Sequence, residues 1–191
     1  MTDIKGILKA KIRSIIQGWT DEDIYAVSFF VYANECNEYA GFENVTEFSV
    51  GYNTESACGE ADEYSEERWN YAYWLQNNEP VISCSEDAPE TEALFVWYRE
   101  NGIANIGYED PECYDEQMIY IGKGPVGQYE LMEVLSDIAR EMQEEGVLQE
   151  RFGRSMPIII HGLEYAWYEM EATKKANPHG EADDFFEAMD F

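Results

Sequence analysis

The sequence predicts one α+β domain, in which a mostly antiparallel sheet is flanked by amphipathic helices. Two observations predict this fold class. Hydrophobic residues make up 45% and aromatic residues 15% of the 191 residues, which is enough for one sizeable core. Stretches with the two-residue period of strands also alternate with longer stretches that have the period of helices. We therefore expect a single domain over 1–191, with 179–191 as an acidic tail.

The first expected element is an amphipathic helix over 3–17. Apolar residues recur there at steps of three and four, namely at Ile4, Ile7, Leu8, Ile12 and Ile15. Three basic residues of the same stretch fall on another side, namely Lys5, Lys9 and Arg13. We expect this basic stripe to fold back on the acidic body or to offset its charge locally. A basic arm for nucleic acid is the less favoured interpretation.

Three stretches predict the sheet. The stretch "IYAVSFFVYAN" (24–34) is β-branched and aromatic on both faces, as in a strand that is covered on two sides. The stretch 46–54 alternates Phe48, Val50 and Tyr52 with small or polar residues, and it is expected to pair with 24–34 in antiparallel fashion. The run "PIIIHG" (157–162) is typical of a buried central strand.

Three further helices are expected to cover the sheet, over 88–101, 126–145 and 163–176. Pro89 suits the first turn of the first of these helices, and Gly146 follows the second. The residues of the third helix that are expected to point inward are Leu163, Trp167 and Met170. A turn of helix that carries phenylalanines is expected within the acidic tail.

The charge excludes several classes of partner. Twelve basic residues against 40 acidic ones give a formal net charge of −28. Phosphates and anionic membrane surfaces repel such a chain, so we expect neither direct nucleic-acid binding nor membrane binding. The acidity can serve solubility or adaptation to salt, or it can serve recognition of a basic protein partner. The sequence leaves both interpretations open.

The cysteines and the N-terminal stretch indicate a reduced, cytoplasmic protein. No C-x-x-C pair occurs, and the four cysteines are widely spaced, at Cys36, Cys58, Cys84 and Cys113. We therefore expect free thiols and no zinc site. The opening residues have charges at helical spacing and no long apolar run, so they predict neither a signal peptide nor a membrane span.

Two motifs resemble ligand-binding or catalytic motifs, but an ordinary structural role is the favoured interpretation of each. In "GKGPVG" (122–127), Lys123 lies between glycines, but the order required for a phosphate loop is absent, and a turn that caps the following helix is favoured. His161 and Glu164 form an H-x-x-E pair, which provides fewer ligands than a zinc enzyme needs. A hydrogen-bonded histidine at a strand end is the favoured interpretation. An enzyme with a site near His161 stays an alternative, and no catalytic residue, metal or cofactor is assigned.

The candidate partner-binding residues lie in two places. In "RWNYAYW" (68–74), Arg68 is the only Lys or Arg between Arg13 and Arg99, and it adjoins a dense aromatic group. The rings can form core, with the guanidinium stacked on one of them beside Glu66 or Glu67, or they can anchor an interface. A loop over 108–117 lacks any base and also lacks the residue order of a calcium loop. The candidates are Arg68, Trp69, Trp74, Glu109, Asp110, Glu112, Asp115 and Glu116.

Four phrases of the chain carry a resemblance to a family. The phrases "RWNYAYW", "YRENGIANIGYED", "YIGKGPVGQYELMEVL" and "FGRSMPIIIHGLEYAWYEMEATKKANPHGEADDFF" resemble the bacterial proteins that are catalogued as domain of unknown function four-three-zero-three. The resemblance spans nearly the whole chain, but its phrases consist of structural residues and carry no catalytic signature. It implies a small acidic protein similar to the immunity proteins of bacterial toxin systems.

The sequence and the resemblance together predict an acidic cytoplasmic binding protein. The preferred function is an immunity-type protein that engages a basic protein partner such as a toxin. Two alternatives are kept. An acidic DNA mimic would need carboxylates spaced like phosphates, and an enzyme would need a concave site around His161.

Overall fold

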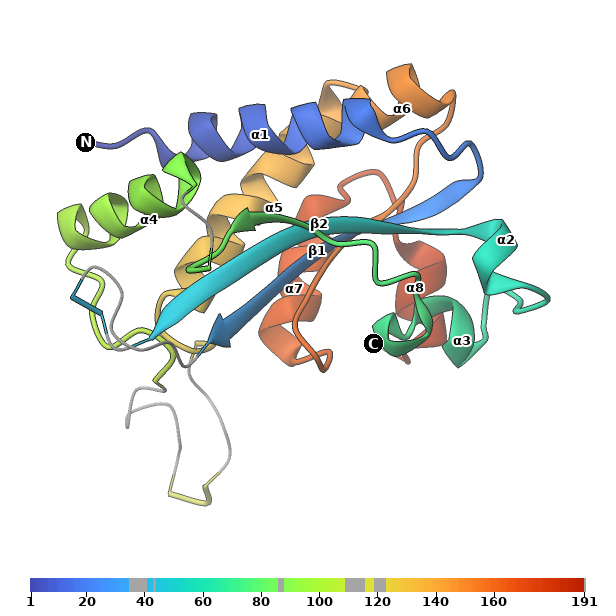
Figure 1. Cartoon of the computed structure of the whole chain (residues 1–191). Coiled ribbons are helices and arrows are strands. Elements are labelled where there is room, and N and C mark those ends of the chain that lie inside the picture. The colour runs from blue at the N-terminus through green and yellow to red at the C-terminus, as the bar shows by residue number, and fades with distance from the viewer. Residues whose placement is uncertain (35–40, 43, 86–87, 109–115, 119–122, 191) are drawn as a thin grey trace.

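A sheet with the strand order β3-β2-β1-β4 lies at the centre of the computed structural model, which describes residues 1–34, 41–42, 44–85, 88–108, 116–118 and 123–190 (Figure 1). Its strands within these residues are β1 (Ile24–Asn34), β2 (Val45–Thr54), β3 (Glu79–Ile82) and β4 (Ile158–His161). The pairs β1–β2 and β2–β3 are antiparallel, and the pair β1–β4 is parallel. The predicted α+β class and the mostly antiparallel sheet are confirmed.

Both faces of β1 are covered, which explains its apolar composition on both sides. Val27, Phe29 and Val31 belong to the core on one face, and Ser28 and Phe30 alternate with them toward the other. Phe29 pairs with Val50 of β2 and with Ile160 of β4, so the larger core runs across β2, β1 and β4.

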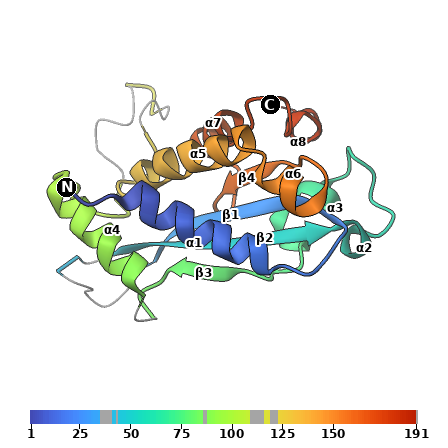
Figure 2. The ribbon, with the colours of Figure 1, turned by 90° about the horizontal axis from the view of Figure 1, so that it is seen from above.

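Helices α1 (Ile4–Gly18), α4 (Pro89–Glu100), α5 (Gln128–Glu144) and α6 (Val147–Phe152) lie on one side of the sheet (Figure 2). The predicted helices over 3–17, 88–101 and 126–145 are thus confirmed. Asp3 caps α1 by accepting a hydrogen bond from the Gly6 N–H at 3.0 Å. Ile7 is exposed, contrary to the prediction, because the buried stripe of α1 continues through Ile16 instead. None of the described helices is long and apolar enough to cross a membrane.

An aromatic cluster covers the opposite face of the sheet. It is formed by side chains from β1 and β4 and from α3 (Glu66–Trp69), η1 (Tyr71–Tyr73), α7 (Trp167–Ala176) and α8 (Asp183–Ala188). Helix α2 (Glu55–Cys58) precedes this layer directly after β2. The expected turn of helix in the tail is confirmed as α8, and its Phe185 is fully buried. The described part of 179–191 therefore packs on the domain.

The last long helix begins later than predicted. We expected it over 163–176, whereas α7 starts at Trp167 and residues 162–166 form an irregular segment. Leu163 is 82% exposed and Trp167 is 45% exposed, so the prediction that they point inward is wrong, whereas Met170 is buried as expected. Buried hydrogen bonds hold the segment 162–166 outside the helix, as described below.

The stretch 157–162 forms the buried strand β4 as expected, but the predicted central position is wrong, because β4 lies at the edge of the sheet. Helix α7 and its C-cap residue close the outer edge of β4. The Ile160 N–H donates to Thr173 Oγ1 at 2.9 Å, and that hydroxyl donates to the Ile160 carbonyl at 3.0 Å. One turn further along α7, Asn177 accepts from the Ile158 N–H at 2.9 Å and donates to the Ile158 carbonyl at 2.8 Å. Two side chains therefore satisfy the backbone groups that a fifth strand would otherwise pair with.

Cys84 departs from the expected set of free thiols. It is disulfide-bonded. Cys58 is a free and partly exposed thiol. The expectation of four free thiols is therefore wrong for Cys84.

Candidate functional site

A buried histidine fixes the start of the segment 162–166. His161 Nδ1 lies 2.7 Å from the Gly162 carbonyl oxygen, and His161 Nε2 lies 2.8 Å from Ser28 Oγ on β1. Burial lowers the pKa of His161 to about 4, so the imidazole is neutral near pH 7. Because a carbonyl oxygen only accepts, Nδ1 carries the single ring proton and the Ser28 hydroxyl donates to Nε2. The favoured interpretation of His161, a hydrogen-bonded histidine at a strand end, is confirmed.

A buried carboxyl group fixes the rest of this segment. Glu169 Oε2 accepts the Ala166 N–H at 3.0 Å in the first turn of α7, and the same carboxyl group accepts the Gly162 N–H. Burial raises the pKa of Glu169 to about 7, because the cost of desolvation outweighs these two hydrogen bonds. A Cβ at position 162 would lie 2.6 Å from Glu169 Oε1, so this close approach requires glycine.

Four aromatic rings surround the imidazole of His161. Their centroids lie 4.6 Å (Tyr71), 5.4 Å (Phe30), 5.8 Å (Tyr165) and 5.9 Å (Trp74) from its own. The Ser28–His161 hydrogen bond has the order of a nucleophile and its base, but both side chains are buried within this shell. The geometry therefore supports a structural role for the pair. An enzyme would instead need an accessible, concave site around His161.

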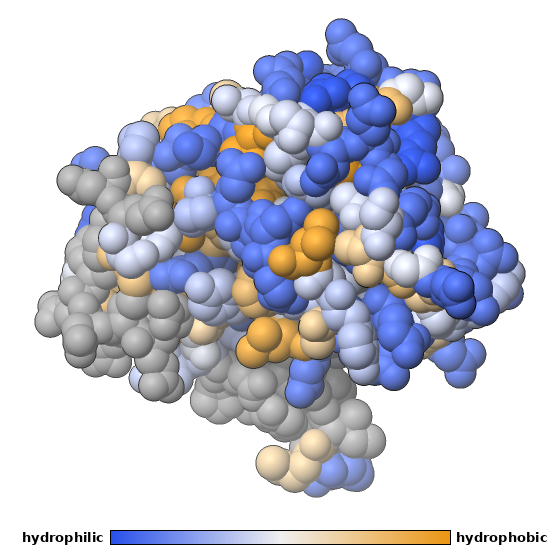
Figure 3. All heavy atoms as spheres, turned by 45° about the vertical axis from the view of Figure 1, so that its right-hand side comes forward, coloured by the Kyte–Doolittle hydropathy of each residue, from blue (hydrophilic) through white to orange (hydrophobic). Residues whose placement is uncertain are grey.

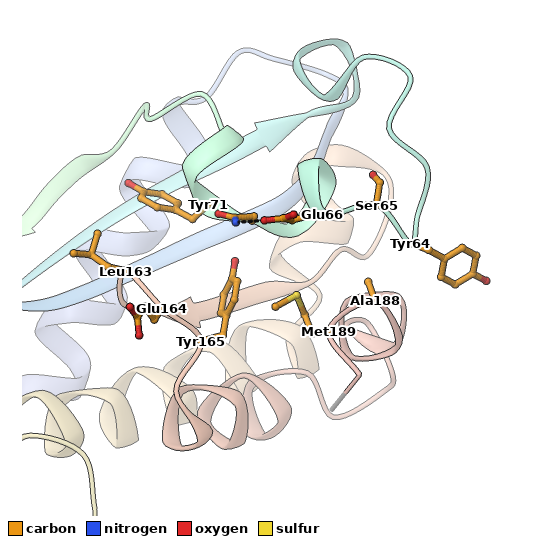
Figure 4. Close-up of a pocket in the computed structure, with 10 residues that line it drawn as sticks. Tyr64, Ser65, Glu66, Tyr71, Leu163, Glu164, Tyr165, Ala188 and Met189 are labelled. Atoms are coloured by element: carbon orange, nitrogen blue, oxygen red, sulfur yellow. Dashed lines mark hydrogen bonds between the residues drawn. The ribbon is translucent and has the colours of Figure 1, made fainter.

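A cavity of about 440 Å³ lies beside this aromatic shell. It is lined by Tyr64, Ser65, Glu66, Asn70, Tyr71, Leu163, Glu164, Tyr165, Ala188 and Met189. In Figure 4, Tyr165 and Met189 extend from one wall toward Glu66, and the ring of Tyr64 points away at the rim. Tyr71 and Tyr165 both line the cavity and contact His161. The volume is in the usual range for small-ligand pockets, about 300–1,000 Å³.

Arg68 is held by its own domain, although its buried Nε has no hydrogen-bond partner among the described residues. Its guanidinium lies 5.5 Å from the centroid of the Trp69 ring, which confirms the expected stacking on a ring of 68–74, and it lies closer, at 3.9 Å, to the ring of Tyr25 on β1. It donates to both carboxylate oxygens of Glu55, at 2.7 and 2.9 Å, so the expected pairing with Glu66 or Glu67 is wrong. These hydrogen bonds lower the pKa of Glu55. Arg68 therefore leaves the carboxylates around the cavity uncompensated.

Two acidic segments meet next to the cavity, and we call them together the acidic face. Its carboxylates are Glu60, Asp62, Glu63, Glu66, Glu67, Glu181, Asp183, Asp184, Glu187 and Asp190. Phe185 of α8 packs on Trp69 of α3, with ring centroids 5.7 Å apart, and the Trp69 indole N–H donates to the Glu63 carbonyl at 2.6 Å. Burial of these rings holds the two segments together against the repulsion of their charges.

No carboxylate of the acidic face forms an ion pair with a described residue. A hydrogen bond to Glu63 raises the pKa of the Tyr64 phenol at the cavity rim, and the negative charges of Glu187 and Asp184 raise it further. Figure 3 shows that hydrophilic residues predominate on this side of the molecule, with small hydrophobic patches among them.

The opposite side of the domain compensates its own charge. The basic residues Lys5, Lys9, Arg13, Arg140 and Lys175 pair with Glu133, Asp137, Glu141, Glu144 and Glu145. Lys5 and Lys9 donate to Glu141 at 2.6 and 2.8 Å and lower its pKa to about 2. The predicted folding of the basic stripe onto the acidic body is thus confirmed. The charges are therefore sorted: most of the described ion pairs gather around α1 and α5, whereas the carboxylates of the acidic face take part in none of them.

The other predicted site residues have different surroundings. Trp69 and Trp74 are only 3% and 5% exposed, as the core interpretation of the aromatic group expects. The Trp74 indole N–H donates to the Arg68 carbonyl at 2.9 Å. In this structure neither ring is presented to a partner. Of the candidate carboxylates in the loop over 108–117, only Glu116 is described, as an exposed residue in a turn. Glu109, Asp110, Glu112 and Asp115 lie outside the described residues.

The motif at 122–127 has the structural role that the sequence predicted. Gly127 begins α5 with a φ of 81°, and its N–H donates to Glu130 at 2.6 Å, so the capping turn expected at 122–127 is confirmed at its described end. Within the described residues, no group of three His, Cys, Asp or Glu side chains is placed to hold a metal ion.

No family model matches the chain, and neither a curated protein nor a solved structure proved similar to it. The resemblance to domain of unknown function four-three-zero-three therefore stays a prediction.

Sequence reasoning missed the parts of the site that depend on tertiary contacts. Glu169 lacked the usual sequence signal of a capping box, because the residue at the N-cap is Ala166 and not Ser or Thr. Tyr165 and Met189 come from segments that only the fold brings together. The glycine after a buried strand, Gly162, was the one local signal for a close backbone approach.

Proposed function

We propose that this protein is a binding protein that recognises a basic protein partner through the acidic face. The resemblance to immunity-type proteins suggests a toxin as one such partner. The loop over 108–117 stays a proposed contact, and we add the acidic face, whose carboxylates form no ion pair with a described residue.

The observation that carries the proposal is the sorting of charge. Solubility alone requires a net charge but does not require that ion pairs gather in one part of the domain and be absent from another. Here five cations neutralise five carboxylates around α1 and α5, while the ten carboxylates of the acidic face share no described ion pair. Such a concentrated field attracts a basic surface over distances near the Debye length and raises its association rate.

The proposal is tested by capture followed by kinetics. The wild-type chain is used to capture partners, and the association rate of each identified partner is measured at several concentrations of sodium chloride. A variant with Glu63→Gln, Glu67→Gln and Glu187→Gln removes three charges from the acidic face. We expect a basic partner whose association slows in this variant and slows further as salt rises, with a smaller change in dissociation.

A matched control removes three exposed charges elsewhere, through Glu92→Gln, Glu150→Gln and Glu171→Gln. The control should associate faster than the acidic-face variant, although both have the same net charge. Equal rates for the two variants, or a captured partner that is acidic and indifferent to salt, would refute recognition by the acidic face. Thermal unfolding of each variant checks that the fold is retained.

A further inference from the structure

We infer that the cavity between α3, the segment 162–166 and α8 receives one arginine or lysine side chain of the partner. This inference rests on the proposed function and adds to it a specific point of contact. The acidic face explains long-range attraction, whereas the cavity provides a shaped site in which a single side chain is enclosed.

The walls of the cavity match the two parts of such a side chain. Leu163, Met189 and the ring of Tyr165 provide apolar surface for an aliphatic stem. Glu66 and Glu164 line the same cavity and are both exposed, so their carboxylates are available to a cationic head group. Long basic side chains bury their stems on apolar surface and keep the charge near water or a carboxylate.

The surroundings of the cavity select for positive charge. The carboxylates nearest to it in the chain, Glu63, Glu67 and Glu187, belong to the acidic face. Arg68 is held by Glu55 and by the ring of Tyr25, and so it does not offset this field. An anionic ligand would meet repulsion from the lining itself. A neutral ligand would bring no charge to pair with Glu164 or with Glu66, and the only neutral contact that the Glu66 carboxylate makes among the described residues is one hydrogen bond from Asn70 Nδ2 at 2.9 Å.

The segment 162–166 is also fixed before any ligand arrives. His161 holds the Gly162 carbonyl, Glu169 holds the Gly162 and Ala166 N–H groups, and the Tyr165 hydroxyl donates to the Trp69 carbonyl. A wall that is already ordered loses little conformational entropy on binding. The cavity is therefore preformed, as expected of a specific side-chain site.

The test uses two blocked pentapeptides, Gly-Gly-Arg-Gly-Gly and the same peptide with citrulline in place of the arginine. Citrulline has nearly the same shape but no charge. Titration into the isotopically labelled chain, followed by NMR, should give saturable shifts at Leu163, Tyr165 and Met189 with the arginine peptide only. A lysine peptide is expected to bind at the same residues.

Three variants decide whether the cavity itself is used. Glu164→Gln should weaken binding of the arginine peptide on the order of tenfold, as for loss of one charge-assisted hydrogen bond. Glu171→Gln, an equal change of charge at an exposed position outside the lining, should have much less effect. Ala188→Leu changes no charge but fills the cavity, and it should also weaken binding.

The inference is overturned if the citrulline peptide binds as well as the arginine peptide, or if Glu164→Gln and Glu171→Gln behave alike while Ala188→Leu has no effect. The second result would leave recognition by the acidic face intact, since diffuse attraction does not need the cavity. The kinetics of the partner with the acidic-face variant test that proposal separately.

Discussion

Replacing Glu169 with Gln should change how the stability of the protein depends on pH. The carboxyl group of Glu169 is buried, and burial raises its pKa from 4.5 to about 7. Gln keeps the shape of the side chain and an oxygen that can accept the Ala166 N–H, but it cannot ionise. Gln offers one oxygen to the two N–H groups that the carboxyl group accepts, so the variant loses a hydrogen bond at every pH. The pH dependence of the difference between the two proteins therefore reports the ionisation of this one group.

The sign and size of the effect follow from the two pKa values. Below pH 4.5 Glu169 is protonated in both the folded and the unfolded chain, and its contribution to stability is fully present. As the pH rises toward 7 the unfolded chain ionises first, so the wild type loses stability relative to the variant. Each pH unit between the two pKa values corresponds to about 1.4 kcal/mol, which gives a total loss of about 3 kcal/mol. Above pH 7 the difference becomes constant.

Urea unfolding of both proteins from pH 4 to pH 8, at constant ionic strength, measures this difference. The other carboxylates titrate in the same way in both proteins, so their effects cancel in the comparison. We expect the free energy of unfolding of the variant, relative to the wild type, to rise between pH 4.5 and 7. If the free energies of unfolding of the two proteins changed in parallel over this pH range, Glu169 would have the same pKa in the folded and unfolded chain. That result would refute the inference that its carboxyl group is buried and neutral.

Three further predictions concern the core, the charge and the cysteines. Ile159→Asp should destabilise the fold by several kcal/mol, because it buries a carboxylate, whereas Ile159→Val should cost about 1 kcal/mol; equal melting temperatures for the two would remove this residue from the core. The melting temperature should rise with sodium chloride at pH 7, since salt screens the surplus carboxylates, and a flat response would contradict this. Thiol titration of the denatured, unreduced protein should detect Cys58 but not Cys84, and a count of four thiols would exclude the disulfide.

Local sequence pattern was sufficient for most of the elements. Periodicity and end signals predicted α1, α4, α5 and the central strands, because these segments bury stripes or faces that repeat over many residues. The parallel pairing of β1 with β4 could not be predicted, since it joins residues that are more than 130 positions apart. Helix α7 was predicted to start too early, because the capping carboxyl group of Glu169 draws residues 162–166 away from the helix.

The site was less predictable than the fold, for a related reason. Aromatic spacing around Trp69 fitted both a strand and a helix, and only the packing of Phe185 on Trp69 shows why this group is buried. That contact also assembles the acidic face from segments over 100 residues apart. The sequence showed the excess of negative charge. It could not show which carboxylates are paired, because that depends on the contact of Lys5 and Lys9 with Glu141 of α5.

The closure of β4 by Thr173 and Asn177 limits the ways in which another chain can attach. Many recognition domains capture a peptide by letting it join the border of a sheet, where main-chain pairing gives affinity with little regard to side chains. Here α7 already occupies that position on the β4 border. A strand from another chain could pair with β4 only by displacing α7. The same contacts therefore also protect this sheet edge from edge-to-edge aggregation. A partner that binds at the β4 edge must therefore be recognised through side-chain contacts, which discriminate between partners better than main-chain pairing does.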